Sequence, residues 1–277
     1  MTVRPVLRMY GSKWGLAGWI AAHFPRHDVY VEPFAGTAAV LLTKSPARVE
    51  VLNDLDGEIV NFFRVLRDRP EALIRAVSLT PYARVEARAS WETPPDEDDV
   101  ERARRFLVRS WQTIGGPTTR WKSGFRFRKD RRMAVLLQWW QEMPERLAAA
   151  ASRLRGVLIE NRDYREILED FDGPETLFYL DPPYPPDTRS RQWRRGGYRF
   201  EFSEADHREL LERITALRGM VVLSSYPSPL YEDILGLAGW RKVERSAING
   251  NGKVATEILW INPAATAQLG AAAQLPL

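Results

Sequence analysis

Short apolar segments typical of buried strands alternate with segments of helical period along this chain, and this alternation limits the fold more than any other feature. The strand-like segments are residues 29–31, 49–52, 157–160, 176–180 and 220–225. Strands and helices that alternate in this way form a largely parallel sheet with helices on both faces. We therefore predict an α/β fold.

Two parts of the chain depart from the alternation. Between residues 80 and 155 the strand pattern stops and apolar residues follow a helical period, which predicts an inserted helical subdomain. Near the end, residues 240–248 and 255–261 are strand-like and are joined across Asn249-Gly250-Asn251-Gly252, which predicts an antiparallel hairpin. The predicted organisation is an α/β domain of residues 1–79 and 156–262, a helical insert of residues 80–155, and a disordered Ala- and Gln-rich tail of residues 263–277.

Composition excludes several kinds of protein. A chain of 277 residues can bury a full hydrophobic core without a disulfide or a structural metal. It has no cysteine, and its three histidines, His23, His27 and His207, lie at spacings that do not suggest a metal site. No window approaches the length of a membrane span. We therefore expect a soluble, cytoplasmic protein that binds no metal.

The charge of the chain is unevenly distributed. Its net charge is only +4, but residues 101–132 hold eleven Lys or Arg against two acids. A helix with an acidic start and a basic end would explain this segment as a solvated surface. The segment also holds Trp111, Trp121, Phe125 and Phe127, and cations interleaved with aromatic rings suit phosphate contact and base stacking. Both interpretations stay open at this point.

The segment Asp181-Pro182-Pro183-Tyr184 follows the apolar strand 176–180, at the place where open α/β sheets bind their ligands. Two prolines can simply end a strand, with the aspartate capping a turn. As a functional motif, the Asp181 carboxylate and the Pro182 carbonyl would accept the two N–H groups of an exocyclic amine, which leaves the nitrogen lone pair free to attack. If the amine belongs to a nucleic-acid base, Tyr184 would stack on that base after it has swung out of the double helix. Attack by such an amine on a methyl donor would need no covalent enzyme intermediate. Methylation at the ring carbon of cytosine does require a thiolate, so the absence of cysteine excludes that reaction.

Two other strand ends carry candidate binding residues. Glu32-Pro33-Phe34-Ala35-Gly36 follows strand 29–31, and Gly36 would let a nucleotide-like ligand approach the backbone, or it is an ordinary turn glycine. Asp54 follows strand 49–52, where it would accept hydrogen bonds from ribose hydroxyls or cap a loop. The chain lacks a G-x-G-x-x-G segment, so no pyrophosphate cradle is predicted.

In the order of these motifs the chain resembles the Dam-like class of DNA adenine methyltransferases, over nearly all of residues 7–262. The matching segments are Tyr10-Gly11-Ser12-Lys13, Glu32 to Gly36, Asp54, Asp163 within Asn161-Arg162-Asp163, and Asp181 to Tyr184. Residues 202–210 and 222–225 also look like later motifs of that class. The resemblance implies a Rossmann-like methyltransferase sheet, mostly parallel with the C-terminal antiparallel hairpin, and a helical insert that recognises the target sequence.

The resemblance also implies a reaction and the residues that perform it. The reaction is transfer of a methyl group from S-adenosylmethionine to the exocyclic amino group of adenine in double-stranded DNA, by base flipping and without a metal. The implied catalytic residues are Asp181, Pro182 and Tyr184. The implied cofactor-binding residues are Tyr10, Lys13, Phe34, Gly36, Asp54, Asp163 and Asp181.

DNA contacts are expected from basic residues in two segments, where they would meet phosphates or base edges. In the insert these residues are Arg120, Lys122, Arg126 and Arg128, and after the Asp181 motif they are Arg189, Arg191, Arg194 and Arg195. A solvated basic loop is the alternative interpretation of each of them.

Two features depart from the family pattern. Ala38 stands where a glycine usually follows Gly36, and the insert does not closely match the version associated with GATC recognition, so the target sequence stays open. The alternative functions are amino-methylation of cytosine or of RNA, and a non-catalytic relative that only binds nucleic acid. Aspartate rather than serine at position 181 favours adenine, and the intact Lys13, Asp54 and Asp181 favour an enzyme.

Overall fold

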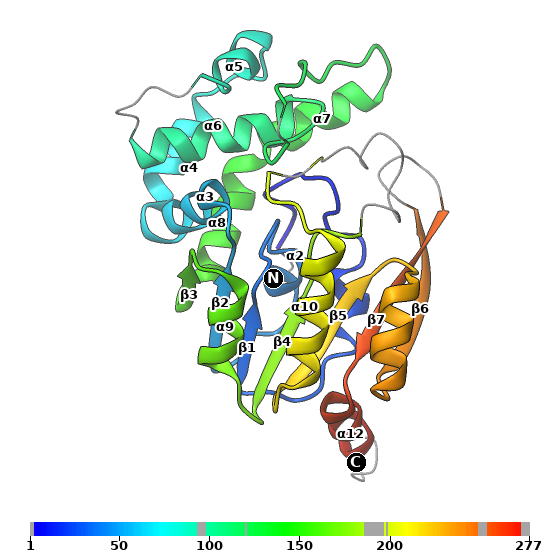
Figure 1. The fold of residues 1–277 in the computed structure, drawn as a ribbon. Helices are drawn as coiled ribbons and strands as arrows, with labels where there is room; N and C mark the ends of the chain where they lie inside the picture. The colour runs from blue at the N-terminus through cyan, green and yellow to red at the C-terminus, as the bar shows by residue number, and fades with distance from the viewer. Residues whose placement is uncertain are drawn as a thin grey trace.

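The structure is a computed structural model that describes residues 3–92, 98–119, 121–185, 197, 199–248 and 254–272. Its centre is a seven-stranded sheet in the order β3-β2-β1-β4-β5-β7-β6 (Figure 1). The strands are β1 (Val29–Glu32), β2 (Val49–Asn53), β3 (Val157–Glu160), β4 (Thr176–Leu180), β5 (Met220–Ser225), β6 (Arg241–Ile248) and β7 (Val254–Ile261). The first five strands are parallel, and β7 is antiparallel to both β5 and β6. This confirms the predicted mostly parallel sheet with antiparallel C-terminal strands.

Strands β1 and β4 are neighbours in the sheet, although residues 33–175 separate them in the sequence. The strand order changes direction between them, because the chain first adds β2 and β3 on one side of β1 and then β4 and β5 on the other. Ligands of open α/β sheets bind at the carboxyl ends of the strands at such a point. The segments that follow Glu32 and Leu180 are therefore brought together by topology.

Side chains alternate between the two faces of the sheet, so the strands β1, β2, β4, β5 and β7 contribute to two apolar clusters. Tyr30 and Tyr179 pack on one face, and Val31 and Phe178 pack on the other. The first face is covered by α1 (Ala17–Ala21), α2 (Ala39–Thr43), α3 (Gly57–Asp68) and α8 (Met143–Leu154). The second face is covered by α9 (Tyr164–Phe171), α10 (Glu204–Thr215), α11 (Pro229–Tyr231) and the π-helical turn η2 (Glu232–Gly236).

Two helices beside the Asp181 motif begin with side-chain caps. The Asp56 carboxylate accepts the Glu58 N–H at the start of α3, at 3.0 Å. Ser203 and Asp206 form a reciprocal capping box at the start of α10. A side-chain oxygen at these positions satisfies backbone N–H groups that the first turn of a helix leaves without partners. The caps fix where α3 and α10 begin, and residues just before each helix line the same cavity as the Asp181 motif.

Helices occupy the chain between β2 and β3, as predicted. After α3 these are α4 (Pro70–Ser78), α5 (Arg84–Ala89), α6 (Asp99–Gln112), α7 (Arg132–Gln141) and α8, and α5 to α7 lie above the sheet in Figure 1. Phe106 and Leu107 of α6 belong to the same apolar cluster as Tyr30 and Leu52 of the sheet. The helical segment thus shares a core with the sheet, and its division from the sheet domain at residue 80 stays a prediction.

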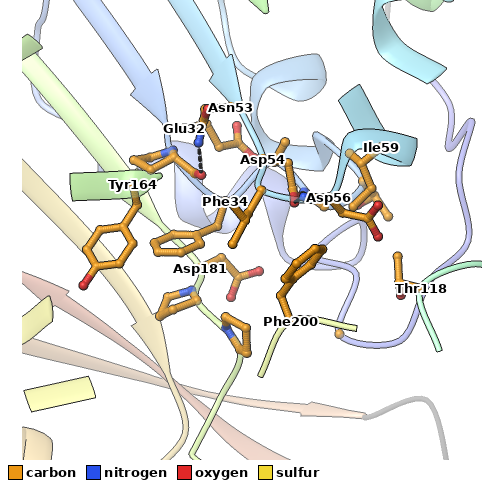
Figure 2. A pocket seen from close by; sticks show the side chains of 18 of the residues that line it. Glu32, Phe34, Asn53, Asp54, Asp56, Ile59, Thr118, Tyr164, Asp181 and Phe200 are labelled. Carbon is orange, nitrogen blue, oxygen red and sulfur yellow. Dashed lines mark hydrogen bonds between the residues drawn. The ribbon is translucent and has the colours of Figure 1, made fainter. Parts of the chain in front are cut away.

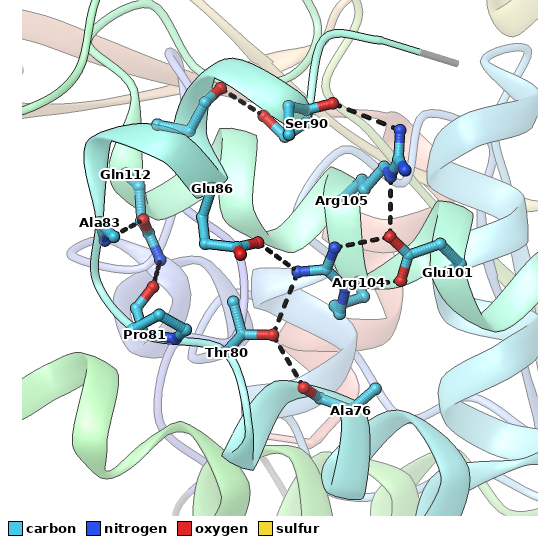
Figure 3. A network of polar contacts seen from close by, with 12 residues as sticks. Ala76, Thr80, Pro81, Ala83, Glu86, Ser90, Glu101, Arg104, Arg105 and Gln112 are labelled. Atoms are coloured by element: carbon cyan, nitrogen blue, oxygen red, sulfur yellow. Dashed lines mark hydrogen bonds and ion pairs between the residues drawn. The ribbon is translucent and has the colours of Figure 1, made fainter. Parts of the chain in front are cut away.

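Arginines of α6 pair with acids inside the helical segment (Figure 3). The Arg104 guanidinium donates to Glu101 at 2.6 Å, to Glu86 at 2.8 Å and to the Thr80 hydroxyl at 3.1 Å. Arg105 donates to the same Glu101 carboxylate at 2.8 Å. In this part of the basic segment the arginines form ion pairs within and between helices. Their charges therefore stabilise the helical segment itself.

The tail after residue 262 was expected to be disordered, and this expectation is wrong for the described residues. Residues Pro263–Ala272 form α12. The side-chain oxygen of Asn262, which is only 4% exposed, accepts the N–H groups of Ala265 at 2.9 Å and Val221 at 3.0 Å. Asn262 therefore caps the helix and ties it to β5, and proline at the first helical position favours this start.

Within the described residues, no helix combines the length and the hydrophobicity that crossing a membrane requires.

Candidate active site

A cavity of about 460 Å³ opens where β1, β2 and β4 end. Figure 2 shows Asp181, Asp54, Phe34 and Glu32 around it. Of the sequence-predicted cofactor and catalytic residues, all line this cavity: Tyr10, Lys13, Phe34, Gly36, Asp54, Asp163, Asp181, Pro182 and Tyr184. Residues that are distant in sequence are thus brought to one site by the strand order.

Asp181 and Lys13 form a partly buried ion pair at the cavity. The Lys13 ammonium lies 2.9 Å from the Asp181 Oδ1 atom and also donates to the Gly11 carbonyl at 2.9 Å. The Lys13 side chain is 7% exposed and that of Asp181 is 20% exposed. Burial raises the pKa of Asp181, and the positive charge of Lys13 opposes this rise. The ion pair therefore favours an ionised, hydrogen-bond-accepting carboxylate in a site poor in water.

Tyr184 is held from three sides. Its hydroxyl donates to the Glu257 Oε2 atom at 3.1 Å, and its ring meets the Tyr226 ring edge-on with centroids 4.5 Å apart. The Lys13 Nζ atom lies 4.6 Å from the centre of the Tyr184 ring. Glu257, on β7, was missed by sequence reasoning. Its only signal in the sequence is that it is the one charged residue of the segment 254–261.

The turns after β1 and β2 are joined through the Asp54 carboxylate. It accepts the N–H groups of Gly36 and Asp56, both at 2.9 Å, and burial raises its pKa to about 7. Gly36 has a φ of +48°, and Ala38, which stands where the family usually has glycine, has a φ of +51°. The left-handed conformation costs a non-glycine residue about 1 kcal/mol, so Ala38 is a strained position beside the cavity.

Asn53 joins the ends of three strands and was not singled out from the sequence. Its side-chain nitrogen donates to the carbonyls of Pro33 at 2.9 Å and Arg162 at 3.1 Å, and its oxygen accepts the Arg162 N–H at 2.9 Å. The residue is 1% exposed. A single buried amide thus sets the distance between the loops that follow β1, β2 and β3.

We expect Asn53→Leu to lower the free energy of unfolding by about 2–4 kcal/mol, because it leaves buried backbone groups without partners. Urea unfolding followed by circular dichroism measures this change. The control is Asn61→Leu, which removes one exposed hydrogen bond to the Asp99 carbonyl. Equal effects of the two substitutions would contradict the role assigned to Asn53.

One wall of the cavity is aromatic. The rings of Phe34, Tyr164 and Phe202 lie 5.4 to 5.7 Å apart, centre to centre. Beside them the Asp163 carboxylate caps α9 by accepting the Arg165 N–H at 2.9 Å and pairs with the Arg165 guanidinium at 2.9 Å. This wall offers an apolar surface for a flat ring together with a carboxylate at its edge.

The cavity holds several carboxyl groups that are removed from water. Burial raises the pKa of Glu32 to about 8 and also raises the pKa of Asp56. The Asp56 Oδ2 atom is buried, and no donor to it is found among the residues that the structure describes. Together with Asp54 and Asp181, these groups make the cavity suitable for a ligand that carries positive charge and hydrogen-bond donors.

The residues predicted to contact DNA have different surroundings. Lys122 and Arg128 are exposed. The Arg126 guanidinium donates to the Thr113 carbonyl at 2.7 and 3.0 Å and to the Ile114 carbonyl at 3.0 Å, and burial lowers its pKa to about 10. Arg126 thus stabilises its own loop through hydrogen bonds to backbone carbonyls. The other predicted contacts lie outside the described residues: Arg120, Arg189, Arg191, Arg194 and Arg195.

Comparison with known proteins gives one family. The family described as D12 class N6 adenine-specific DNA methyltransferase matches residues 10–243. A type II methyltransferase of Lactococcus lactis subsp. cremoris is 24% identical over 95% of this chain and 96% of that protein. A DNA adenine methylase of Salmonella typhi is 23% identical over 90% of each chain. A DNA N-6-adenine-methyltransferase of Escherichia phage P1 is 23% identical over 86% of this chain and 32% of that protein.

Proposed function

The chain belongs to the D12 class N6 adenine-specific DNA methyltransferases, and from this premise we propose that it transfers a methyl group from S-adenosylmethionine to the N6 atom of an adenine turned out of duplex DNA. The observation that carries the proposal is the position of Asp181. It follows β4, pairs with Lys13 at 2.9 Å and lines the same cavity as Asp54.

The residues of the cavity fit this cofactor. S-adenosylmethionine carries its methyl group on a sulfonium cation and supplies an electrophile that needs no metal. The buried Asp56 Oδ2 atom, which lacks a donor among the described residues, and the raised pKa of Asp54 are consistent with a ligand that brings hydroxyl donors and positive charge. The residues proposed to hold it are Tyr10, Lys13, Phe34, Gly36, Asp54, Asp163 and Asp181.

Asp181, Pro182 and Tyr184 would act on the adenine. The Asp181 carboxylate and the Pro182 carbonyl would accept the two N–H groups of the amine, so that the nitrogen lone pair is withdrawn from the ring and directed at the methyl group. Tyr184 would stack on the base. In the free protein Lys13 occupies Asp181 Oδ1, so the amine and the Lys13 ammonium would share this carboxylate during the reaction.

Binding of S-adenosylmethionine should strengthen as the pH rises. Because burial raises the pKa of Asp54 to about 7 and that of Glu32 to about 8, the free folded protein holds extra protons near neutral pH. A cationic ligand favours the ionised carboxyls, so these protons leave on binding. Affinity should rise by up to about tenfold per pH unit for each proton released, at pH values below about 7 for Asp54 and below about 8 for Glu32. Titration calorimetry at several pH values measures the affinity and the protons released.

The control ligand is S-adenosylhomocysteine, which lacks the sulfonium charge. We expect its affinity to change less over the same pH range. Identical pH dependence for the two ligands, or none for either, would contradict the electrostatic part of the proposal.

The loop that carries Lys122 and Arg128 borders the cavity, because Thr118 lines it and accepts the Arg199 N–H at 3.0 Å. We propose that these two cations contact DNA phosphates. The logarithm of the affinity falls as the logarithm of the salt concentration rises. Lys122→Ala and Arg128→Ala should each make this slope less steep by about 1. Fluorescence anisotropy with a labelled duplex measures the slope, and Arg241→Ala, on the edge strand β6, is the control. Unchanged slopes in both loop variants would contradict the contact.

The reaction itself is tested with duplex DNA and S-adenosylmethionine labelled in the methyl group. We expect label in N6-methyladenosine after digestion of the DNA to nucleosides. Label in N4-methylcytosine would instead support methylation of the cytosine amino group, and label only in RNA substrates would support methylation of RNA. Absence of cofactor binding in calorimetry would favour a protein that only binds nucleic acid.

A further inference from the structure

Glu257 is a buried acid at the active site that the reaction described above does not use. It is 9% exposed, and its Oε2 atom accepts the Tyr184 hydroxyl at 3.1 Å. It lies on β7, outside the residues 10–243 that the family matches. The strand reaches the site because Ile258, the next residue, pairs with Ser225 of β5. Burying a carboxylate is unfavourable unless it is hydrogen-bonded, so its partner at this position is informative.

The hydrogen bond to Glu257 restrains the Tyr184 ring in one orientation. A tyrosine ring can tilt about its Cα–Cβ and Cβ–Cγ bonds, and a base can stack on it well only in one plane. The Tyr226 and Tyr184 rings pack edge-to-face, with 72° between their planes. The Lys13 ammonium lies over the Tyr184 ring. The remaining constraint is at the far end of the ring, where Glu257 holds the hydroxyl.

We propose that Glu257 is a positioning residue for methyl transfer. By accepting the Tyr184 hydroxyl it keeps the ring in the plane required for stacking on the flipped adenine. This inference rests on the proposed function.

The test is a double-mutant cycle of Glu257→Leu and Tyr184→Phe, with rates of a single turnover measured at saturating S-adenosylmethionine and DNA. Each single substitution breaks the same hydrogen bond, so each should slow transfer by about tenfold or more. In the Tyr184→Phe background Glu257→Leu should have almost no further effect. Glu257→Gln keeps an acceptor oxygen and should lose less than Glu257→Leu. The control is Glu244→Gln on β6, where the side chain is 53% exposed.

A second measurement reports the base directly. A duplex with 2-aminopurine at the target position becomes less fluorescent when the flipped base stacks on an aromatic ring. We expect Glu257→Leu and Tyr184→Phe to raise the fluorescence of the bound duplex, and Glu257→Gln to leave it near that of the wild type. If Glu257→Leu does not fold, Tyr184→Phe, which breaks the same hydrogen bond and leaves β7 unchanged, is compared with Glu257→Gln, which keeps it.

Equal losses from the Glu257 substitution in both backgrounds, or fluorescence unchanged in every variant, would overturn the inference. These outcomes require an active wild-type enzyme. A wild-type protein that does not methylate adenine would instead contradict the proposed function, and this inference with it.

Discussion

Replacing Asp181 with alanine should lower the rate of methyl transfer by about 10³-fold or more, because the carboxylate is the acceptor that directs the lone pair of the adenine amine. The proposed contacts to the adenosine part of the cofactor come mainly from the loops of Asp54 and Phe34. Binding of S-adenosylmethionine should therefore change by no more than about threefold, the effect of a small loss of contact energy.

The experiment compares incorporation of labelled methyl groups with the cofactor affinity from calorimetry. Asp233→Ala, in an exposed position of η2, is a matched loss of an aspartate away from the cavity. Methyl incorporation by the Asp181→Ala variant at a rate close to that of the wild type would refute the catalytic role. A complete loss of cofactor binding would show that the residue serves the cofactor instead.

Lys13→Met should produce the second large effect. Burial raises the pKa of Asp181, and Lys13 is the charge that opposes it at 2.9 Å. Without the ammonium the pKa rises further, so a smaller fraction of the carboxyl is ionised at a given pH, and the protonated form donates where it should accept. Loss of an opposite charge at this distance changes the ionised fraction by about 10- to 100-fold at pH values below the pKa of the variant, and the rate should fall by a comparable factor.

The pH profile distinguishes this cause from a general loss of structure. The rate of the Lys13→Met variant should rise with pH, by up to about tenfold per unit, over the range in which the carboxyl ionises, and approach that of the wild type above this range. Rates are measured at saturating cofactor, because Lys13 also lines its site. Lys242→Met, which removes an exposed ammonium, is the control. A flat profile would contradict the assigned role of Lys13.

The strand ends could be predicted from the sequence because the signals there are local. An apolar run followed by Asp181-Pro182, or by Glu32-Pro33, marks the carboxyl end of a buried strand, and parallel topology then brings such ends together. The helices followed from the helical period of their apolar residues. These signals need only neighbouring residues, so they were sufficient for the fold and for most of the cavity.

The residues that were missed depend on contacts between distant segments. Glu257 reaches Tyr184 through the register of β7 against β5, which no local pattern specifies. Asn53 was visible only as the end of a strand, although it binds two loops that are far away in the sequence. Arg126 was predicted as a DNA contact from its charge, and its folded environment gives it backbone carbonyls as partners. Burial and pairing of this kind appear only in three dimensions.

The position of the last strand has a consequence for how the enzyme is made. Strand β7 is the final strand in the sequence, yet it lies between β5 and β6 and supplies the acceptor for Tyr184, which is 73 residues earlier. A chain that is still being synthesised can form the parallel strands before this segment leaves the ribosome. Tyr184 then lacks the acceptor that Glu257 provides, and we expect full activity only after β7 has left the ribosome and paired with β5.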